Sequence, residues 1–320
     1  MSNRLKSFAL ASLVFSLTCG VGLAASDVVV KHTLAQTAAS SDGKAEADKL
    51  FQDGVQLFRR GEYPKALQSY QRVLEIRRKL GDKAGIGQTL NNIGVIYNVF
   101  QQNDKGLEIL QQALTIRKEI KDRAGEGETL DALGGLYFSL EQDEKSLLTL
   151  QQALPITREV KDKSLEFQIL VSLGDSYTKQ EKYDKTLDFY QQALPLANKN
   201  TEQEAAILVL IGNCYFQQGK HDLAIENLQK SLIITRKIKN LTIEAQTLAG
   251  IAVNYHAHKK HDKAIEFYQQ ALALYGETAN NRSTKLTILM QIMRIYYVNA
   301  SDATLQKDYY QGMIREFMLV

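Results

Sequence analysis

A unit of about 40 residues recurs along the chain and constrains the fold more than any other sequence feature. The tetrapeptide Gln-Gln-Ala-Leu occurs at residues 111–114, 151–154, 191–194 and 269–272. A small residue also recurs, at intervals of 40, 40, 40, 38 and 40 residues, at Gly54, Gly94, Gly134, Gly174, Gly212 and Ala252. A fixed period of roughly 20–50 residues is typical of a solenoid, in which each repeat packs against its neighbours.

Each repeat predicts two helices. In the second repeat, apolar residues recur at helical spacing within 90–97 and again within 107–116, and polar turns follow each stretch. The expected helices span 44–60 and 63–80, 83–100 and 103–120, 123–140 and 143–160, 163–180 and 183–199, 201–218 and 221–238, and 241–258 and 261–276. A degenerate seventh pair is expected at 281–299 and 302–317. The predicted fold is an all-α solenoid of antiparallel helix hairpins, with about 14 helices.

The recurring glycine predicts a close approach of two helices. Glycine inside a helix costs about 1 kcal/mol relative to alanine, so its return at one position suggests a packing role. We expect Gly94 to lie beside Tyr97 of its own helix and opposite Ala113 of the second helix, as a ridge fits into a groove.

Three further details concern the second helices. Asp104, Asp143 and Asp184 stand where a side-chain oxygen is expected to cap them. Pro155 and Pro195 follow the same tetrapeptide and are expected to kink the helix at one repeat position. The basic residues of 77–79, 117–118 and 236–237 are expected to complement the helix dipole.

These repeats resemble the tetratricopeptide repeat. Its pattern of Leu-Gly-x-x-Tyr in the first helix is matched by residues 93–97, 133–137, 173–177 and 211–215, and the second-helix pattern Ala-x-x-x-aromatic by 66–70 and 264–268. The period is 40 residues instead of about 34, which lengthens both helices, as in the kinesin-light-chain-like subgroup and in bacterial arrays fused to a CHAT domain. Residues 278–320 are too few to contain a CHAT domain.

The resemblance implies that the first helices line a concave face on which a protein or peptide segment binds. Asn91 and Asn92 are the leading candidates, because an amide both donates and accepts hydrogen bonds and can hold an extended backbone. The candidate partner-binding residues are Gln88, Asn91, Asn92, Asn98, Glu128, Asp131, Gln168, Ser172, Asp175, Asn213 and Gln246.

The resemblance also indicates which partner is disfavoured. Chaperone-binding members grip a C-terminal carboxylate with a Lys/Asn/Arg set, which this sequence lacks. The corresponding face carries Glu128, Asp131 and Asp175 instead. A neutral or basic segment is therefore expected to bind there in preference to an acidic one.

Residues 1–24 have the pattern of a secretory signal peptide. Arg4 and Lys6 precede an apolar stretch at 8–17, and small residues around Ala24 offer cleavage sites. The mature protein is then expected in the periplasm or outside the cell, after a flexible linker at 25–43. An uncleaved signal that anchors the protein in the membrane, or lipidation at Cys19, are the alternatives.

Charge and composition exclude several function classes. Removal of residues 1–24 leaves 37 basic and 36 acidic residues, and no clustered basic patch indicates nucleic-acid binding. His256, His258 and His261 lack the spacing of a helical metal site, and Cys214 is expected to be a buried core residue. No catalytic constellation or cofactor motif is found, so no catalytic residue, metal or cofactor is predicted.

The predicted function is therefore a non-enzymatic scaffold. Six repeats at 44–277 would bind a partner, and residues 278–320 would form the degenerate seventh hairpin and a C-terminal cap. The end of the chain is apolar, from Tyr309 to Val320. The alternative is a regulatory or assembly subunit that self-associates through this apolar end.

Overall fold

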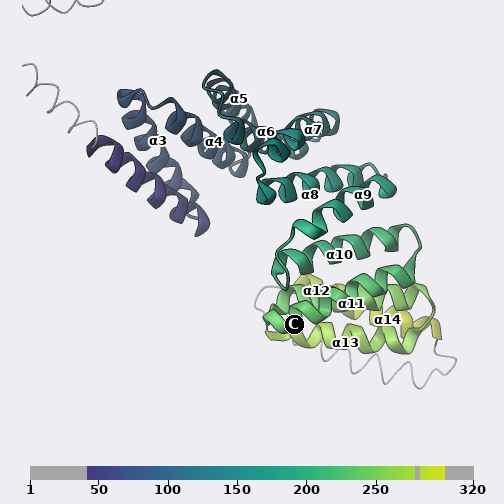
Figure 1. Cartoon of the computed structure of the whole chain (residues 1–320). Helices are drawn as coiled ribbons and strands as arrows, with labels where there is room; N and C mark the ends of the chain where they lie inside the picture. The colour runs from purple at the N-terminus through teal and green to yellow at the C-terminus, as the bar shows by residue number, and fades with distance from the viewer. Residues whose placement is uncertain (1–41, 278–281, 300–320) are drawn as a thin grey trace, which may run out of the picture. The chain divides into compact units, whose positions relative to one another are not determined.

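The structure is a computed structural model that describes residues 42–277 and 282–299 (Figure 1). The predicted signal peptide, nearly all of the predicted linker and the predicted helix at 302–317 lie outside these residues. The apolar C-terminal end lies outside them too. Asp42 and Gly43, which were expected to end the linker, already belong to the first described helix.

The described residues form helices joined by short turns, with no strand among them. A helix over 42–59 is followed by α3 (Tyr63–Leu80), α4 (Lys83–Val99), α5 (Asn103–Glu119), α6 (Arg123–Ser139), α7 (Asp143–Val160), α8 (Lys163–Lys179), α9 (Tyr183–Ala193) with the 3₁₀ helix η1 (Leu194–Leu196), α10 (Glu202–Gln217), α11 (His221–Ile238), α12 (Leu241–Ala257), α13 (His261–Glu277) and α14 (Arg282–Asn299). All bounds except those of α9 fall within two residues of the prediction.

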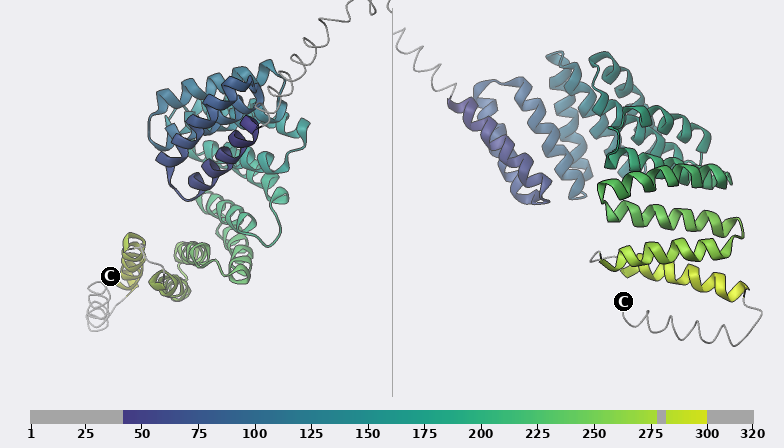
Figure 2. Two further views of the ribbon diagram at one scale, coloured as in Figure 1. Left: turned by 90° about the vertical axis from the view of Figure 1, so that its left-hand side faces the viewer. Right: turned by 60° about the horizontal axis from the view of Figure 1, so that its bottom comes forward.

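The helices pack as hairpins against their neighbours in the sequence, which confirms the predicted all-α solenoid. The chain divides into two compact units, one up to Gly125 and one from Glu126. In the second unit, α10, α11, α12 and α13 follow one another side by side in chain order (Figure 2). Buried apolar side chains of α11 to α14 form one continuous cluster there.

The 40-residue period has a simple structural origin. α4, α5, α6 and α8 each contain 17 residues, and three residues join each helix to the next. Every such turn contains one left-handed residue; for example, Gln101 and Lys121 both have φ of 58°. The N–H groups of Gln101 and Gln102 bond to the carbonyls of Asn98 and Tyr97 at 2.9 Å and so satisfy the helix end.

Side-chain N-caps precede the first helices α4, α6 and α8 and are not found at the second helices α5, α7 and α9. Asp82 and Asp122 each accept the N–H of the third residue beyond them at 2.9 Å, and Asp162 accepts that of Leu165 at 3.0 Å. The second helices α5, α7 and α9 follow residues without a side-chain cap. The predicted caps Asp104, Asp143 and Asp184 are therefore wrong; these residues lie inside the first turn, beside the positive end of the helix dipole.

The two prolines do not share one structural effect, contrary to the prediction. α7 continues through Pro155 to Val160, where the buried side chains of Ile156 and Thr157 hold it in place. At Pro195 the α-helix has already ended, and the chain leaves η1 in an extended conformation at Ala197. This repeat is two residues shorter than the others, so the second helix cannot reach its usual length.

The recurring glycine has the expected packing role, but its neighbour is a different residue. A Cβ atom added to Gly94 would lie 2.6 Å from Leu110, and one added to Gly134 would lie 2.6 Å from Leu150. The large side chain therefore comes from the second helix, one turn before the predicted Ala113. The same contact joins Gly54 to a tyrosine ring, that of Tyr70.

A buried arginine joins the first two hairpins. Arg77 is only 4% exposed, and its guanidinium donates to the Gly85 carbonyl at 2.9 Å, the Thr89 hydroxyl at 2.9 Å and the Asp48 carboxylate at 3.0 Å. It also lies over the Phe51 ring, 4.7 Å from its centre. The prediction that this arginine only complements the helix dipole is therefore incomplete.

The glycines next to these arginines have a steric reason. A Cβ at Gly85 would lie 2.6 Å from the Arg77 side chain, and Gly125 has the same relation to the buried Arg117. In two later repeats the arginine position holds a buried threonine, and the glycine position holds an apolar residue. These pairs are Thr157 with Leu165 and Thr235 with Ile243. In these two repeats the larger side chain comes from the first helix and not from the second.

We predict opposite effects for alanine at two adjacent glycines. Gly134→Ala should destabilise the protein by about 1–3 kcal/mol, because its Cβ would overlap Leu150. Gly135→Ala is the matched control, because no atom lies within 4 Å of its added Cβ, and it should stabilise by up to about 1 kcal/mol. Urea unfolding of both variants measures this; equal effects would contradict the packing role.

A second prediction concerns Arg77. Arg77→Lys should lower the free energy of unfolding by about 2 kcal/mol, because an ammonium cannot reproduce the planar, multiply bonded guanidinium. Arg78→Lys changes an exposed neighbour and should stay within about 0.5 kcal/mol of the parent protein. Thermal unfolding followed by circular dichroism compares the two, and similar losses would show that burial of Arg77 is unimportant.

Candidate functional site

All eleven predicted partner-binding residues lie on first helices. We call this set of positions on α4, α6, α8, α10 and α12 the first-helix face. Its exposed members are Gln88, Glu128, Gln168, Asn213 and Gln246. Its half-buried members are Asn91, Asn92, Asn98, Asp131, Ser172 and Asp175. The α4 residues belong to the first compact unit and the others to the second, and each unit is described on its own.

The two leading candidates on α4 differ in how their amides are used. The Asn92 side chain hydrogen-bonds the Tyr70 hydroxyl of the preceding repeat. The Asn91 side-chain oxygen is buried and has no hydrogen-bond partner among the described residues. Gln88 accepts a hydrogen bond from Arg77 at 3.3 Å. Asn91 is therefore the α4 amide with unused hydrogen-bonding capacity.

The acidic residues of the first-helix face differ in their hydrogen-bond partners and in the pKa of their carboxyl groups. Asp175 accepts a 2.5 Å hydrogen bond from the Tyr190 hydroxyl, and burial raises the pKa of its carboxyl. Burial alone raises the pKa of Asp131 to about 6, and no salt bridge to it is found within the described ranges. Asp131 occupies the repeat position of Asn91, so two successive first helices carry a half-buried polar residue at the same repeat position.

The recurring Gln-Gln-Ala-Leu is explained by contacts that link neighbouring repeats. The first glutamine of the tetrapeptide donates to a tyrosine hydroxyl on the next first helix, from Gln151 to Tyr177 at 3.3 Å and from Gln191 to Tyr215 at 3.2 Å. Each tyrosine is the one that ends the Leu-Gly-x-x-Tyr pattern. These bonds fix the spacing of consecutive first helices in the second unit.

Three of the tyrosines at this repeat position, Tyr97, Tyr137 and Tyr177, contact a lysine from their own repeat. Lys105 lies over the Tyr97 ring at 5.8 Å from its centre, and Lys145 lies over Tyr137 at 5.6 Å. Cation–π contacts of this kind contribute about 0.5–1 kcal/mol at exposed sites. The lysine after each turn therefore has a structural use, and the face is built from side chains that are already held in place.

The histidines of α12, α13 and the turn between them contact different neighbours. The Nδ1 atoms of His256 and His261 are 3.4 Å apart, whereas His258 lies 3.7 Å from Asp222. No group of three metal-ligating side chains occurs within residues 42–277 and 282–299. Burial raises the pKa of the Cys214 thiol to about 11, so the thiol stays protonated at neutral pH.

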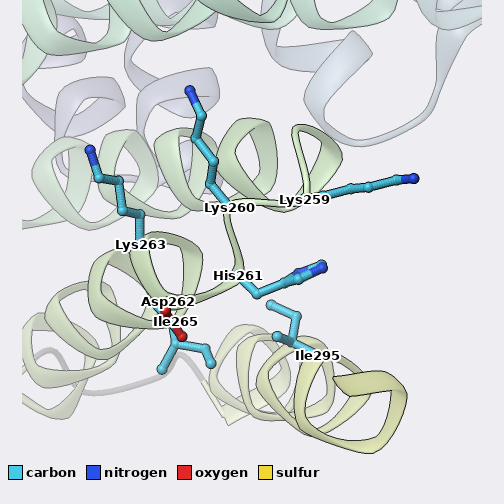
Figure 3. Close-up of a pocket in the computed structure, with 7 residues that line it drawn as sticks. All are labelled: Lys259, Lys260, His261, Asp262, Lys263, Ile265 and Ile295. Atoms are coloured by element: carbon cyan, nitrogen blue, oxygen red, sulfur yellow. The ribbon is translucent and has the colours of Figure 1, made fainter. Parts of the chain in front are cut away.

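Sequence reasoning missed one feature, a cavity at the turn between α12 and α13. Lysine, histidine and isoleucine side chains line it (Figure 3). The sequence signal was the run Lys-Lys-His-Asp-Lys at 259–263, which places three lysines where other turns have fewer. Helical periodicity carried no information about it, because the cavity depends on how α14 packs beside α13.

Across the described part of the chain, the helices all fall short of the length or apolar character that a membrane span requires.

We predict that Asp131 makes stability depend on pH. Its folded-state pKa of about 6 lies above its ordinary value of 3.8, so ionisation opposes folding, and stability should fall between about pH 4 and pH 6. Asp131→Asn, which copies Asn91, should stabilise the protein at pH 7.5 by up to about 3 kcal/mol and have little effect at pH 3.5. Urea unfolding at both pH values measures this, and a pH-independent difference would contradict it.

The comparisons with known proteins agree with this architecture. Models of the tetratricopeptide repeat match residues 85–159 and 203–277, and residues 56–84 and 169–204, which together exceed half of the chain. No curated protein matches the sequence.

Solved structures are similar in fold at low sequence identity. A signal-transduction ATPase with a tetratricopeptide repeat sensor from Pyrococcus horikoshii is 17% identical with a TM-score of 0.74, over 86% of this chain and 42% of that protein. This chain therefore spans less than half of that ATPase. Two structures of a putative kinesin light chain from Podosopora anserina are 15% identical with a TM-score of 0.53, over 59–60% of this chain and 94–96% of that one.

A Rap protein complexed with competence and sporulation factor is 13% identical to this chain, with a TM-score of 0.57, over 79% of this chain and 75% of that one. Identities this low establish the fold and leave function to other arguments. Because the family models cover most of the described helices and the hairpins stack as the repeat requires, the chain belongs to the tetratricopeptide repeat family.

Proposed function

We propose that the protein is a non-enzymatic scaffold that binds a protein or peptide segment across its first-helix face. Tetratricopeptide repeats support a binding role in general, and the Rap structure contains a bound factor on a similar fold. The observation that carries the proposal is an exposed polar side chain that recurs at one position of the first helices. Apolar side chains form the core, while α4, α6, α8 and α12 present Gln88, Glu128, Gln168 and Gln246 at the same repeat position.

A rigid first-helix face would increase the affinity for a partner. The Gln–Tyr hydrogen bonds and the Lys–Tyr contacts hold the surface residues before a partner arrives. Less conformational entropy is then lost on binding, so the same contacts give a higher affinity. Within the second unit, first helices joined by these bonds favour an extended segment, which can contact successive repeats.

The charge of the face favours a neutral or basic segment. Asp131 is mostly ionised at neutral pH and has no salt bridge within the described ranges, whereas Asp175 is partly satisfied by Tyr190. An incoming cation would offset the desolvation of Asp131. An acidic segment would add repulsion to that cost and should bind more weakly.

We also propose that the protein acts after export, with the signal at 1–24 removed and the partner met in the periplasm or outside the cell. The apolar chain end supports self-association as the second candidate, and it lies outside the described residues. A homo-oligomer would be compatible with either function.

Site-specific photo-crosslinking tests the proposed face. A photoreactive residue is placed singly at exposed first-helix positions, namely Gln88, Gln168, Asn213 and Gln246. Matched controls are exposed positions on second helices, namely Glu108, Asp188, Glu226 and Glu266. We expect discrete adducts with one partner from the first set only. Adducts from the second set alone would assign binding to the opposite surface, and adducts with the chain itself would favour self-association.

A further inference from the structure

We propose that the turn between α12 and α13 forms a second binding site, for a phosphate or carboxylate group attached to a small apolar body. The cavity has a volume of about 480 Å³ and lies between this turn, the start of α13 and α14 (Figure 3). Its described lining residues are Lys259, Lys260, His261, Asp262, Lys263, Ile265 and Ile295. None of them belongs to the predicted first-helix face, so the site is independent of the proposed function.

The lining is strongly cationic. The lining contains three lysines and a single acid, Asp262, which gives a formal charge of +2 with the histidine neutral. No carboxylate within the described ranges forms a salt bridge with Lys259, Lys260 or Lys263. A cationic cavity without internal neutralisation is electrostatically complementary to an anion.

This charge is peculiar to one repeat. The equivalent five-residue turns at 101–105, 181–185 and 219–223 each have a formal charge of zero, and that at 141–145 has a charge of −2. The repeat itself therefore does not require three lysines at this place. The contact between a turn lysine and the preceding tyrosine ring requires only one lysine in each turn.

The turn also holds the lysines in defined positions. The N–H groups of Lys259 and Lys260 bond to the carbonyls of His256 and Tyr255 at 2.9 Å. The ammonium groups of Lys260 and Lys263 lie 6.0 and 5.4 Å from the centre of the Tyr255 ring. Figure 3 shows these two side chains extending in the same direction. Two cations on one ring are a local excess of charge that an anion would relieve.

Neighbouring groups add to the positive potential. The Nδ1 atoms of His256 and His261 are 3.4 Å apart. Burial lowers the pKa of His256, and the nearby His261 and Arg294 lower it further. Arg294 of α14 therefore places one more positive charge near this end of α12.

The remaining wall is apolar and selects the rest of the ligand. Ile265 of α13 is 9% exposed and Ile295 of α14 is 1% exposed, so they form an apolar base that leaves a ligand only a small contact area. Figure 3 shows the His261 ring just above Ile295. A ligand that combines an anionic head with an aliphatic body would satisfy both parts of the lining, through charge-assisted hydrogen bonds and apolar contact.

Isothermal titration calorimetry of the full-length protein tests the site with two probes, inorganic phosphate and isovalerate, at low ionic strength. We expect saturable binding at one site for at least one probe. Phosphate alone would assign the phosphate class, and isovalerate alone the aliphatic carboxylate class. Failure of both probes to saturate would overturn the proposal.

The variant Lys259→Gln/Lys260→Gln/Lys263→Gln should weaken binding by about tenfold or more, because it removes every lysine of the lining. The matched control Lys182→Gln/Lys185→Gln/Lys220→Gln removes the same number of charges from two neutral turns and should stay within about twofold. Equal weakening in both would show only general charge attraction and would overturn the site.

A single substitution separates an effect on binding from an effect on folding. Lys259→Gln leaves both contacts with the Tyr255 ring in place and should weaken binding by about twofold to threefold, with an unchanged thermal unfolding midpoint. Unchanged binding in this variant and in the triple variant would contradict the assignment.

Discussion

The contact between a recurring glycine of five first helices and a large side chain of the following second helix underlies the rest of the structure. At Gly134 the partner is Leu150, and at Gly54 it is the Tyr70 ring. Close approach lets two 17-residue helices pack along their length, and three-residue turns then complete a 40-residue period. Because each hairpin is similar in shape, the next one can stack on it and bury the apolar side chains that remain.

Contacts between hairpins use different chemistry in different repeats. The first repeats place buried arginines against glycines, as in Arg77 with Gly85, while two later repeats place a threonine and an apolar residue at those positions. The arginine version adds directional hydrogen bonds, so it links the first two hairpins in a more specific way than apolar packing would.

The first-helix face shows how surface and core depend on each other. Tyr177 and Tyr215 accept hydrogen bonds from glutamines of the preceding repeat. The first glutamine of the repeated tetrapeptide therefore links one repeat to the next at these two places. On α4 the buried side-chain oxygen of Asn91 has no hydrogen-bond partner, and on α6 burial opposes the ionisation of Asp131, so each of these positions would gain from a bound segment. The cationic cavity at the α12–α13 turn is different, because it has three lysines and the contact with the tyrosine ring requires only one.

Periodicity in the sequence was sufficient to identify the helices, the hairpins and the helices that bear the candidate residues, because helical spacing and turn chemistry act over a few residues. It could not identify the side chain opposite each glycine, the burial of Arg77 or the different outcomes at Pro155 and Pro195. Those features depend on side chains brought together from separate helices, and local spacing does not record such contacts. The cavity beside His261 has the same origin, since it exists only where α14 packs against α13.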